Sequence, residues 1–302
     1  MLRPLPHRGD VVAAGAVALA TLVVLLQVRF DDVWAGGVHL AYATLAAVFV
    51  GTLALRSPRE GPDPRAYQSA LLAATLAIAA SAVFRLAAVV GEGSFDDGGT
   101  VFWMAGTLAL LGLALARLRN SALCLLLGAA SLVVAIVAAV QWIFSPEGAG
   151  AFRWVLLVIT AVLALATVAV RDRAPARAAA LADAGGLTAL ALALTFGLEV
   201  SFDDAPPPSP GAGWEMFLFA CGFGLCAYSA VDRKPGPGWI GTLVLIVTAL
   251  IASEGDKTLI GWPLVLAIGA GGLLAIGLRP SRPLPPAPTE GEADVLDIRV
   301  DR

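Results

Sequence analysis

Acidic pairs that recur after long apolar stretches are the residues best suited to chemistry in this chain. The triplet Phe-Asp-Asp occurs three times, and its carboxylates belong to Asp31, Asp32, Asp96, Asp97, Asp203 and Asp204. Hard oxygen ligands of this kind suit Ca²⁺ or Mg²⁺, so loops that converge could form a cation site or a partner site. The alternative for Asp32 and Asp97 is helix capping, because each stands just before an apolar run.

Arg85 is a charged residue inside an apolar stretch, one to two helical turns from the end of that stretch. A charge at this depth indicates a substrate anion site or a structural role. In the structural role its long side chain reaches the headgroup layer or pairs with Glu92, Asp96 or Asp97. Arg85 is therefore the first candidate for an intramembrane polar site.

His39 and Tyr42 complete that candidate site. They are three residues apart near the start of another apolar stretch, on the same face of the expected helix. A proton relay through His39 would need Asp31 or Asp32 as its titrating partner. A packed, hydrogen-bonded histidine is the simpler alternative.

Several classes of site are excluded by the residue types present. The chain has two histidines and three cysteines, and the cysteines all fall within apolar runs. Multi-histidine metal sites, the Gly-x-Ser-x-Gly motif and phosphate-binding glycine loops are therefore missing from the sequence. We expect a protein that is not an enzyme and that needs no cofactor. The arginines are dispersed over short loops, so we expect no nucleic-acid binding.

The composition predicts the elements that must position these residues. Hydrophobic residues make up 58% of the chain, charged residues 14%, and the mean hydropathy is +0.82. These values differ strongly from those of soluble domains. The fold class is therefore an all-α integral membrane protein in contact with the lipid bilayer.

Ten apolar runs, most of them close to the length of about 20 residues that spans a bilayer, predict about ten transmembrane helices. Each Phe-Asp-Asp triplet separates two runs, as do the looser copy Phe144-Ser145-Pro146-Glu147 and the segment Ser253-Glu254-Gly255-Asp256. We therefore group the runs as five repeated helical hairpins in a transmembrane domain of residues 1–278. The expected hairpins are 11–55, 70–116, 123–170, 178–231 and 239–278. Small residues four apart, such as Ala220 and Gly224, are expected to form packing faces.

The basic residues predict the orientation. Of twenty lysines and arginines, sixteen fall on one side of the expected membrane and three on the other, with Arg85 inside a helix. The positive-inside rule then places both termini in the cytoplasm and the Phe-Asp-Asp loops outside. We expect a multi-pass protein of a bacterial-type plasma membrane.

Residues 279–302 form a separate tail, first rich in proline and then acidic. Its last part alternates in hydrophobicity through Val295, Leu296, Ile298 and Val300, a pattern that could add a strand to a partner's sheet. Disorder is the alternative, because a short tail lacks a core of its own.

Two functions are compatible with these features. The first is a scaffold or accessory subunit that binds partner proteins through its outer acidic loops and its tail. The second is a small-molecule transporter, since ten helices with both ends inside resemble the drug/metabolite exporter superfamily in topology. That resemblance covers helix number alone and implies a substrate path, which here would suit a neutral or apolar solute because few charges lie within the helices.

Overall fold

The computed structural model describes residues 8–58, 60, 61, 63–90, 97–197, 210–253 and 262–277. Within these ranges the regular structure is helical, and the helices are α1 (Gly9–Arg29), α2 (Gly36–Arg56), α3 (Ala66–Val90), α4 (Gly98–Arg119), α5 (Ala122–Phe144), α6 (Gly150–Val170), α7 (Pro175–Gly197), α8 (Ala212–Asp232), α9 (Pro235–Ser253) and α10 (Trp262–Gly277). Each predicted apolar run thus contains a helix.

Nine of the described helices are long and apolar enough to cross a membrane, and α10 contributes a shorter apolar stretch, Pro263–Gly272. The all-helical, polytopic class is therefore confirmed. The ninth run, expected over 239–252, begins earlier as α9 at Pro235. Prolines are tolerated in a first helical turn because the N–H groups there have no partner within the helix.

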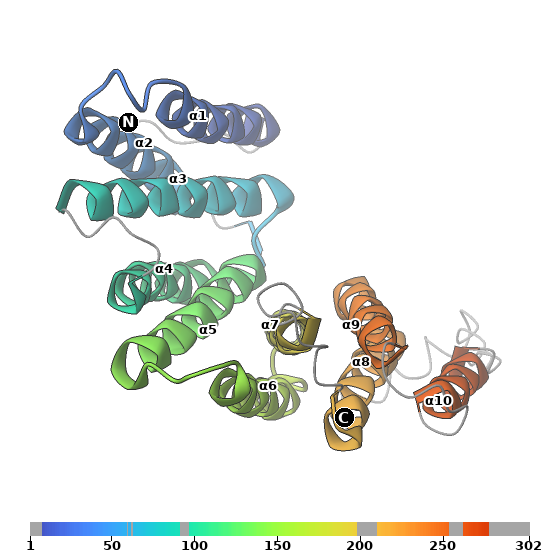
Figure 1. Cartoon of the computed structure of the whole chain (residues 1–302). Helices are drawn as coiled ribbons and strands as arrows, with labels where there is room; N and C mark the ends of the chain where they lie inside the picture. Colours follow the sequence, from blue (N-terminus) through green and yellow to red (C-terminus); the bar gives the residue numbers. More distant parts are fainter. Residues whose placement is uncertain are drawn as a thin grey trace, which may run out of the picture.

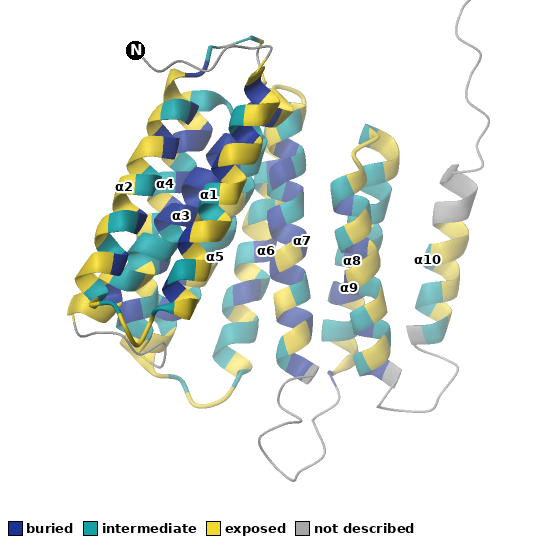
Figure 2. Cartoon of the chain, turned by 90° about the horizontal axis from the view of Figure 1, so that it is seen from above, coloured by how far each residue is buried: buried dark blue, intermediate teal, exposed yellow. Residues whose placement is uncertain are grey.

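The helices run up and down along one common direction, as Figure 2 shows. They follow one another in chain order across the molecule, from α1–α3 through α4–α6 to α7–α9, with α10 at the edge (Figure 1). In the group α1–α3, both α1 and α2 pack mainly on α3. α7 lies at the centre of the second half, in contact with α5, α6, α8 and α9.

The closest packing joins helices across the arginine-rich loops: α2 with α3, α4 with α5, α6 with α7, and α8 with α9. The pairs expected as hairpins, such as α1 with α2 and α7 with α8, touch less. The tightly packed unit is therefore shifted by one helix from the expected one. Duplication of a two-helix unit stays a prediction.

Glycines explain the close packing of two of these pairs, α4 with α5 and α8 with α9. A Cβ at Gly112 of α4 would lie 2.8 Å from the Cα of Gly128 in α5, and a Cβ at Gly241 of α9 would lie 2.7 Å from the carbonyl oxygen of Gly222 in α8. The two backbones can approach this closely only because no side chain intervenes. Both pairs are joined by two-residue loops that begin with a left-handed residue, Asn120 or Arg233.

Candidate functional site

The predicted intramembrane residues meet where α1, α2 and α3 share one end of the molecule. We call this group the Arg85 cluster: Gln27, Asp31, His39, Tyr42, Ser81 and Arg85. The Arg85 guanidinium lies 2.5 Å from Asp31 Oδ1 and donates to the Gln27 carbonyl at 2.9 Å. The Ser81 hydroxyl donates to Gln27 Oε1 at 2.6 Å. These bonds tie α3 to the end of α1.

The partner of Arg85 is thus Asp31, from the preceding loop. The sequence predicts Glu92, Asp96 or Asp97 instead, which follow Arg85 in the chain. Asp97 caps α4 instead, and Glu92 and Asp96 lie outside the described residues. The side chain of Arg85 is 12% exposed and that of Asp31 is 57% exposed, so the pair lies at the boundary of the packed helices.

His39 is fully buried, and both its ring nitrogens are engaged. Nδ1 lies 3.0 Å from the Tyr42 hydroxyl, and Nε2 lies 3.2 Å from the Phe30 carbonyl oxygen. The Trp34 ring packs against Phe30 and His39, with centroid distances of 4.7 and 5.6 Å. This geometry agrees with the packed alternative for His39 and not with a relay to Asp31 or Asp32.

The capping prediction is right for Asp97 and wrong for Asp32. Asp97 Oδ2 accepts from the Thr100 backbone N–H and from the Thr100 hydroxyl, each at 2.9 Å, and Oδ1 accepts from the Gly99 N–H. These hydrogen bonds, that of the Thr100 N–H foremost, lower the pKa of Asp97. Helix α2 begins at Gly36 after a turn, with Ala35 as its N-cap and no side-chain cap, so Asp32 lies too early to cap it.

The cation site remains a prediction. Asp31 binds Arg85 and Asp97 caps α4, whereas Asp96, Asp203 and Asp204 lie outside the described residues. Among the residues that the structure does describe, no three His, Cys, Asp or Glu side chains come together to hold a metal ion. The tail residues Val295, Leu296, Ile298 and Val300 also lie outside the described ranges.

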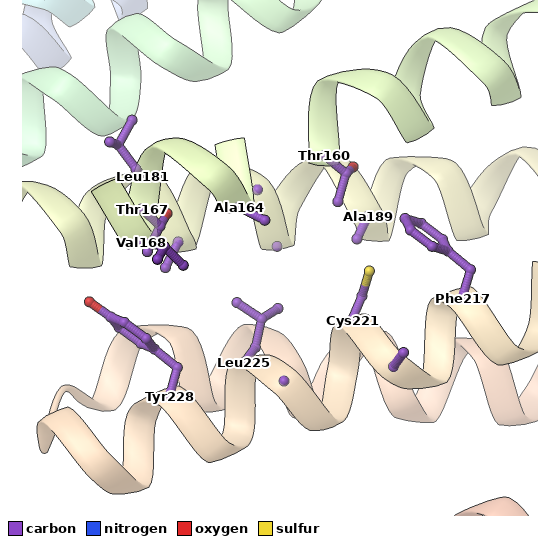
Figure 3. A pocket seen from close by; sticks show the side chains of 15 residues that line it. Thr160, Ala164, Thr167, Val168, Leu181, Ala189, Phe217, Cys221, Leu225 and Tyr228 are labelled. Atoms are coloured by element: carbon purple, nitrogen blue, oxygen red, sulfur yellow. The ribbon is translucent and has the colours of Figure 1, made fainter. Parts of the chain in front are cut away.

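A second candidate lies between α6, α7 and α8, and we call it the α6–α8 groove. It has a volume of about 350 Å³. Small and apolar side chains dominate its lining, which comprises Thr160, Ala164, Thr167, Val168, Leu181, Ala182, Gly185, Gly186, Ala189, Phe217, Ala220, Cys221, Gly224, Leu225 and Tyr228. Figure 3 shows Phe217, Cys221, Leu225 and Tyr228 on α8 pointing toward α6 and α7.

Few polar atoms are available inside this groove. The hydroxyls of Thr160 and Thr167 donate to carbonyls of their own helix, each at 2.8 Å. Cys221 is a free thiol, and the buried Tyr228 hydroxyl has no hydrogen-bond partner among the described residues. The groove can therefore receive an apolar group and offers little for catalysis of a polar reaction.

Ala220 and Gly224 were expected to pack against another helix, and they line this groove instead. No atom comes within 4 Å of the position that a Cβ at Gly224 would take. Small residues of α7, Ala182, Gly185, Gly186 and Ala189, line the groove from the other side. Because α7 and α8 touch only weakly, two stripes of small residues face an open space.

Charged groups surround one end of the α6–α8 groove. Arg171 follows α6, and its guanidinium pairs with Asp232, with Nε donating to Oδ2 at 2.9 Å. Its Cζ lies 5.7 Å from the centroid of the Tyr228 ring. The hydrogen bonds to Asp232 raise the pKa of Arg171, so this side chain keeps its charge. Arg233 and Lys234 are exposed directly after α8.

Asp183 of α7 is a polar group near this end that the groove does not include. Its carboxylate lies against the first turn of α9, since a Cβ at Gly236 would be 2.8 Å from Oδ2. Its Oδ1 is buried without a partner among the described residues. A side chain at position 236 would require this carboxylate to move.

Comparisons with models of protein families, with curated proteins and with solved structures find no match to this chain.

Proposed function

We propose that this chain is a non-enzymatic, multi-pass protein of a bacterial-type plasma membrane that acts as a scaffold or accessory subunit. Partner proteins bind to the loops that carry the Phe-Asp-Asp triplets and to the tail, residues 279–302. Both termini are cytoplasmic in this proposal, and the triplets lie outside. In this proposal the acidic loops form one surface, which serves as both the cation site and the partner site.

The order imposed on the first Phe-Asp-Asp loop supports this proposal most directly. Arg85 forms an ion pair with Asp31, and the His39 ring is hydrogen-bonded to the Phe30 carbonyl oxygen. Asp32 remains exposed, and Val33 is 73% exposed beside it. A loop held in one conformation with an acidic and an apolar side chain directed outward loses little entropy on binding.

Affinity purification of the full-length protein from native membranes in a mild detergent tests the proposal. We expect one protein to co-purify in a stoichiometric amount. The double variant Asp32→Lys, Val33→Glu should reduce its recovery at least tenfold, and a chain ending at residue 278 should also recover less. Asp172→Lys, an exposed acid at the opposite end of the molecule, is the matched control and should leave recovery unchanged.

The proposal is overturned if native membranes yield only single chains of this protein. It is also overturned if the partner is recovered equally with the loop variant and the shortened chain. The helical content and the elution volume of each purified variant show whether that variant is folded.

A second candidate, transport of a neutral or apolar solute, is favoured by the α6–α8 groove. The groove lies between membrane-spanning helices, and its exposed atoms are apolar. Liposomes that contain the purified protein should then release a neutral lipophilic dye faster than empty liposomes. Gly224→Phe would fill the groove and abolish the difference, whereas Gly106→Phe, at an open site on α4, would not. Equal release with and without protein would exclude transport of this probe.

A further inference from the structure

The α6–α8 groove offers a defined space within the membrane. It extends along α8 from Phe217 to Tyr228, a distance of eleven helical steps, or about 16 Å. Its volume is about 350 Å³, and almost all of its lining is apolar. A long apolar space of this kind suits an extended hydrocarbon chain.

Charged residues gather at the Tyr228 end of the groove. At the Tyr228 end lie four basic residues, Arg171, Arg173, Arg233 and Lys234, against three acidic ones, Asp172, Asp183 and Asp232. Arg173, Arg233 and Lys234 are exposed. Arg171 is fixed by Asp232, and its side chain is still 41% exposed. This end therefore carries an excess of positive charge beside an apolar slot.

Two other apolar hollows in the described part of the chain lack this combination. One, between α4 and α5, is lined by Phe102, Gly106 and Phe144 and lies toward the opposite end of the helices. Another, between α5 and α6, extends toward Trp154 at that same opposite end. The α6–α8 groove reaches Thr167 and Tyr228, one turn from Arg171 and Asp232.

We propose that the α6–α8 groove binds one acyl chain of an anionic phospholipid whose phosphate lies against Arg173, Arg233 and Lys234. Basic residues beside a cleft between transmembrane helices attract anionic headgroups. Guanidinium and ammonium groups both donate charge-assisted hydrogen bonds to phosphate oxygens. The site is independent of the scaffold function, because it lies among α6, α7 and α8.

Crosslinking with a photoreactive phosphatidylglycerol that carries its diazirine on an acyl chain tests this site in the full-length protein. The protein is reconstituted in phosphatidylcholine vesicles, and labelled peptides are identified by mass spectrometry. We expect labelling of α8 around Cys221 and Leu225. Unlabelled phosphatidylglycerol should compete at least fivefold better than unlabelled phosphatidylcholine. This competition needs no variant, so it does not depend on the folding of one.

Two pairs of variants separate the apolar and the charged parts of the site. Gly224→Phe places a ring in the groove and should reduce labelling of α8 at least fivefold, whereas Gly106→Phe on α4 should not. The triple variant Arg173→Gln, Arg233→Gln, Lys234→Gln should abolish the preference for phosphatidylglycerol. Its control is Arg56→Gln with Arg117→Gln, exposed arginines at the ends of α2 and α4.

Three results would overturn the proposal. Equal competition by the two lipids would show ordinary bilayer contact. Labelling that persists in Gly224→Phe would place the chain outside the groove. Absence of lipid label on α8 would show that no acyl chain occupies the groove.

Discussion

At the scale of single residues, the Arg85 cluster shows how the chain accommodates charge within a membrane-spanning helix. Arg85 lies in α3 with its guanidinium against a carboxylate and a backbone carbonyl from α1 and its loop. A charge that leaves water is stabilised when it is paired and hydrogen-bonded. Its Nε and the Gln27 Nε2 are buried without acceptors among the described residues, so the cluster is not fully satisfied.

Removal of the Asp31 carboxylate should therefore destabilise the protein. Asp31→Ala leaves the Arg85 charge without its counter-ion, and we expect a loss of about 1–2 kcal/mol because Asp31 is partly exposed to solvent. The adjacent Asp32→Ala should change the free energy of unfolding by less than about 0.5 kcal/mol. Denaturant unfolding in micelles compares the two variants. Equal effects would mean that the ion pair contributes nothing to stability.

The contacts of His39 predict its tautomer. The Phe30 carbonyl can only accept, so Nε2 must carry the proton of a neutral ring, and the Tyr42 hydroxyl donates to Nδ1. The Tyr42 hydroxyl also lies 3.3 Å from the Val23 carbonyl and can donate to only one of these acceptors at a time. Nitrogen-15 spectra of histidine-labelled protein should show the Nε2–H form. His7→Gln, which leaves a single histidine, assigns the signal, and an Nδ1–H form would contradict the geometry.

The cap at Asp97 predicts a dependence on acid pH. The folded pKa of Asp97 is lowered below its unfolded value, which is about 3.9. The stabilisation is therefore fully present above the unfolded pKa and is lost as the pH falls through the folded pKa. The melting temperature of Asp97→Ala should lie below that of the wild type between pH 5 and 8, and the difference should shrink below about pH 4. A difference that stays constant into acid would rule out the charged cap.

At the scale of elements, glycine contacts decide which helices pack closely. Gly112 faces Gly128 across α4 and α5, and Gly222 faces Gly241 across α8 and α9. Lipid tails are as apolar as the helix surfaces, so steric fit rather than water exclusion brings membrane helices together. The arginine-rich loops join the pairs that fit best. The triplet-bearing loops join pairs that fit less well.

Alanine at two glycines of α4 separates packing from helix propensity. Gly112→Ala places a methyl group 2.8 Å from the Gly128 Cα, so the helices must separate, and we expect a loss of about 1–3 kcal/mol. Gly106→Ala meets no atom within 4 Å and should stabilise α4 by about 0.5–1 kcal/mol. Unfolding of the two variants in the same detergent measures the difference. A stabilising effect of Gly112→Ala would exclude the close approach of α4 and α5.

At the scale of the whole molecule, the helices alternate in direction, so successive loops lie at opposite ends of the bundle. The loops after α2, α4, α6 and α8 share one end with the first described residues. The sixteen basic residues on one predicted side are the reason to place that end in the cytoplasm. Orientation in the membrane is thus a prediction from charge alone.

Thiol labelling tests this orientation. Alanine first replaces Cys124, Cys221 and Cys226, and a single cysteine then replaces Glu147 or Asp172, in the loops at the two ends of α6. A membrane-impermeant maleimide should label Glu147→Cys on intact spheroplasts and Asp172→Cys only after lysis. The reverse pattern would invert the topology and place the triplets in the cytoplasm.

The sequence by itself determined the class of the protein and the approximate bounds of its helices. Runs such as 123–144 need no information from elsewhere in the chain, because an apolar segment in lipid must satisfy its backbone hydrogen bonds internally and so forms a helix. The cap at Asp97 was predictable for the same reason, since its partners Gly99 and Thr100 are its neighbours in the chain. The position of Arg85 in the sequence also predicted at which end of its helix it lies.

The tertiary structure decided which residues at that end meet. Asp31 and Arg85 are 54 residues apart, and of the nearer acids that the sequence offered, Asp97 caps α4. The packing stripe at Ala220 and Gly224 became the lining of a groove because α8 packs on α9 and not closely on α7. Hydropathy acts along a single helix, whereas the choice between neighbouring helices rests on steric contacts between distant segments, such as that of Gly222 with Gly241.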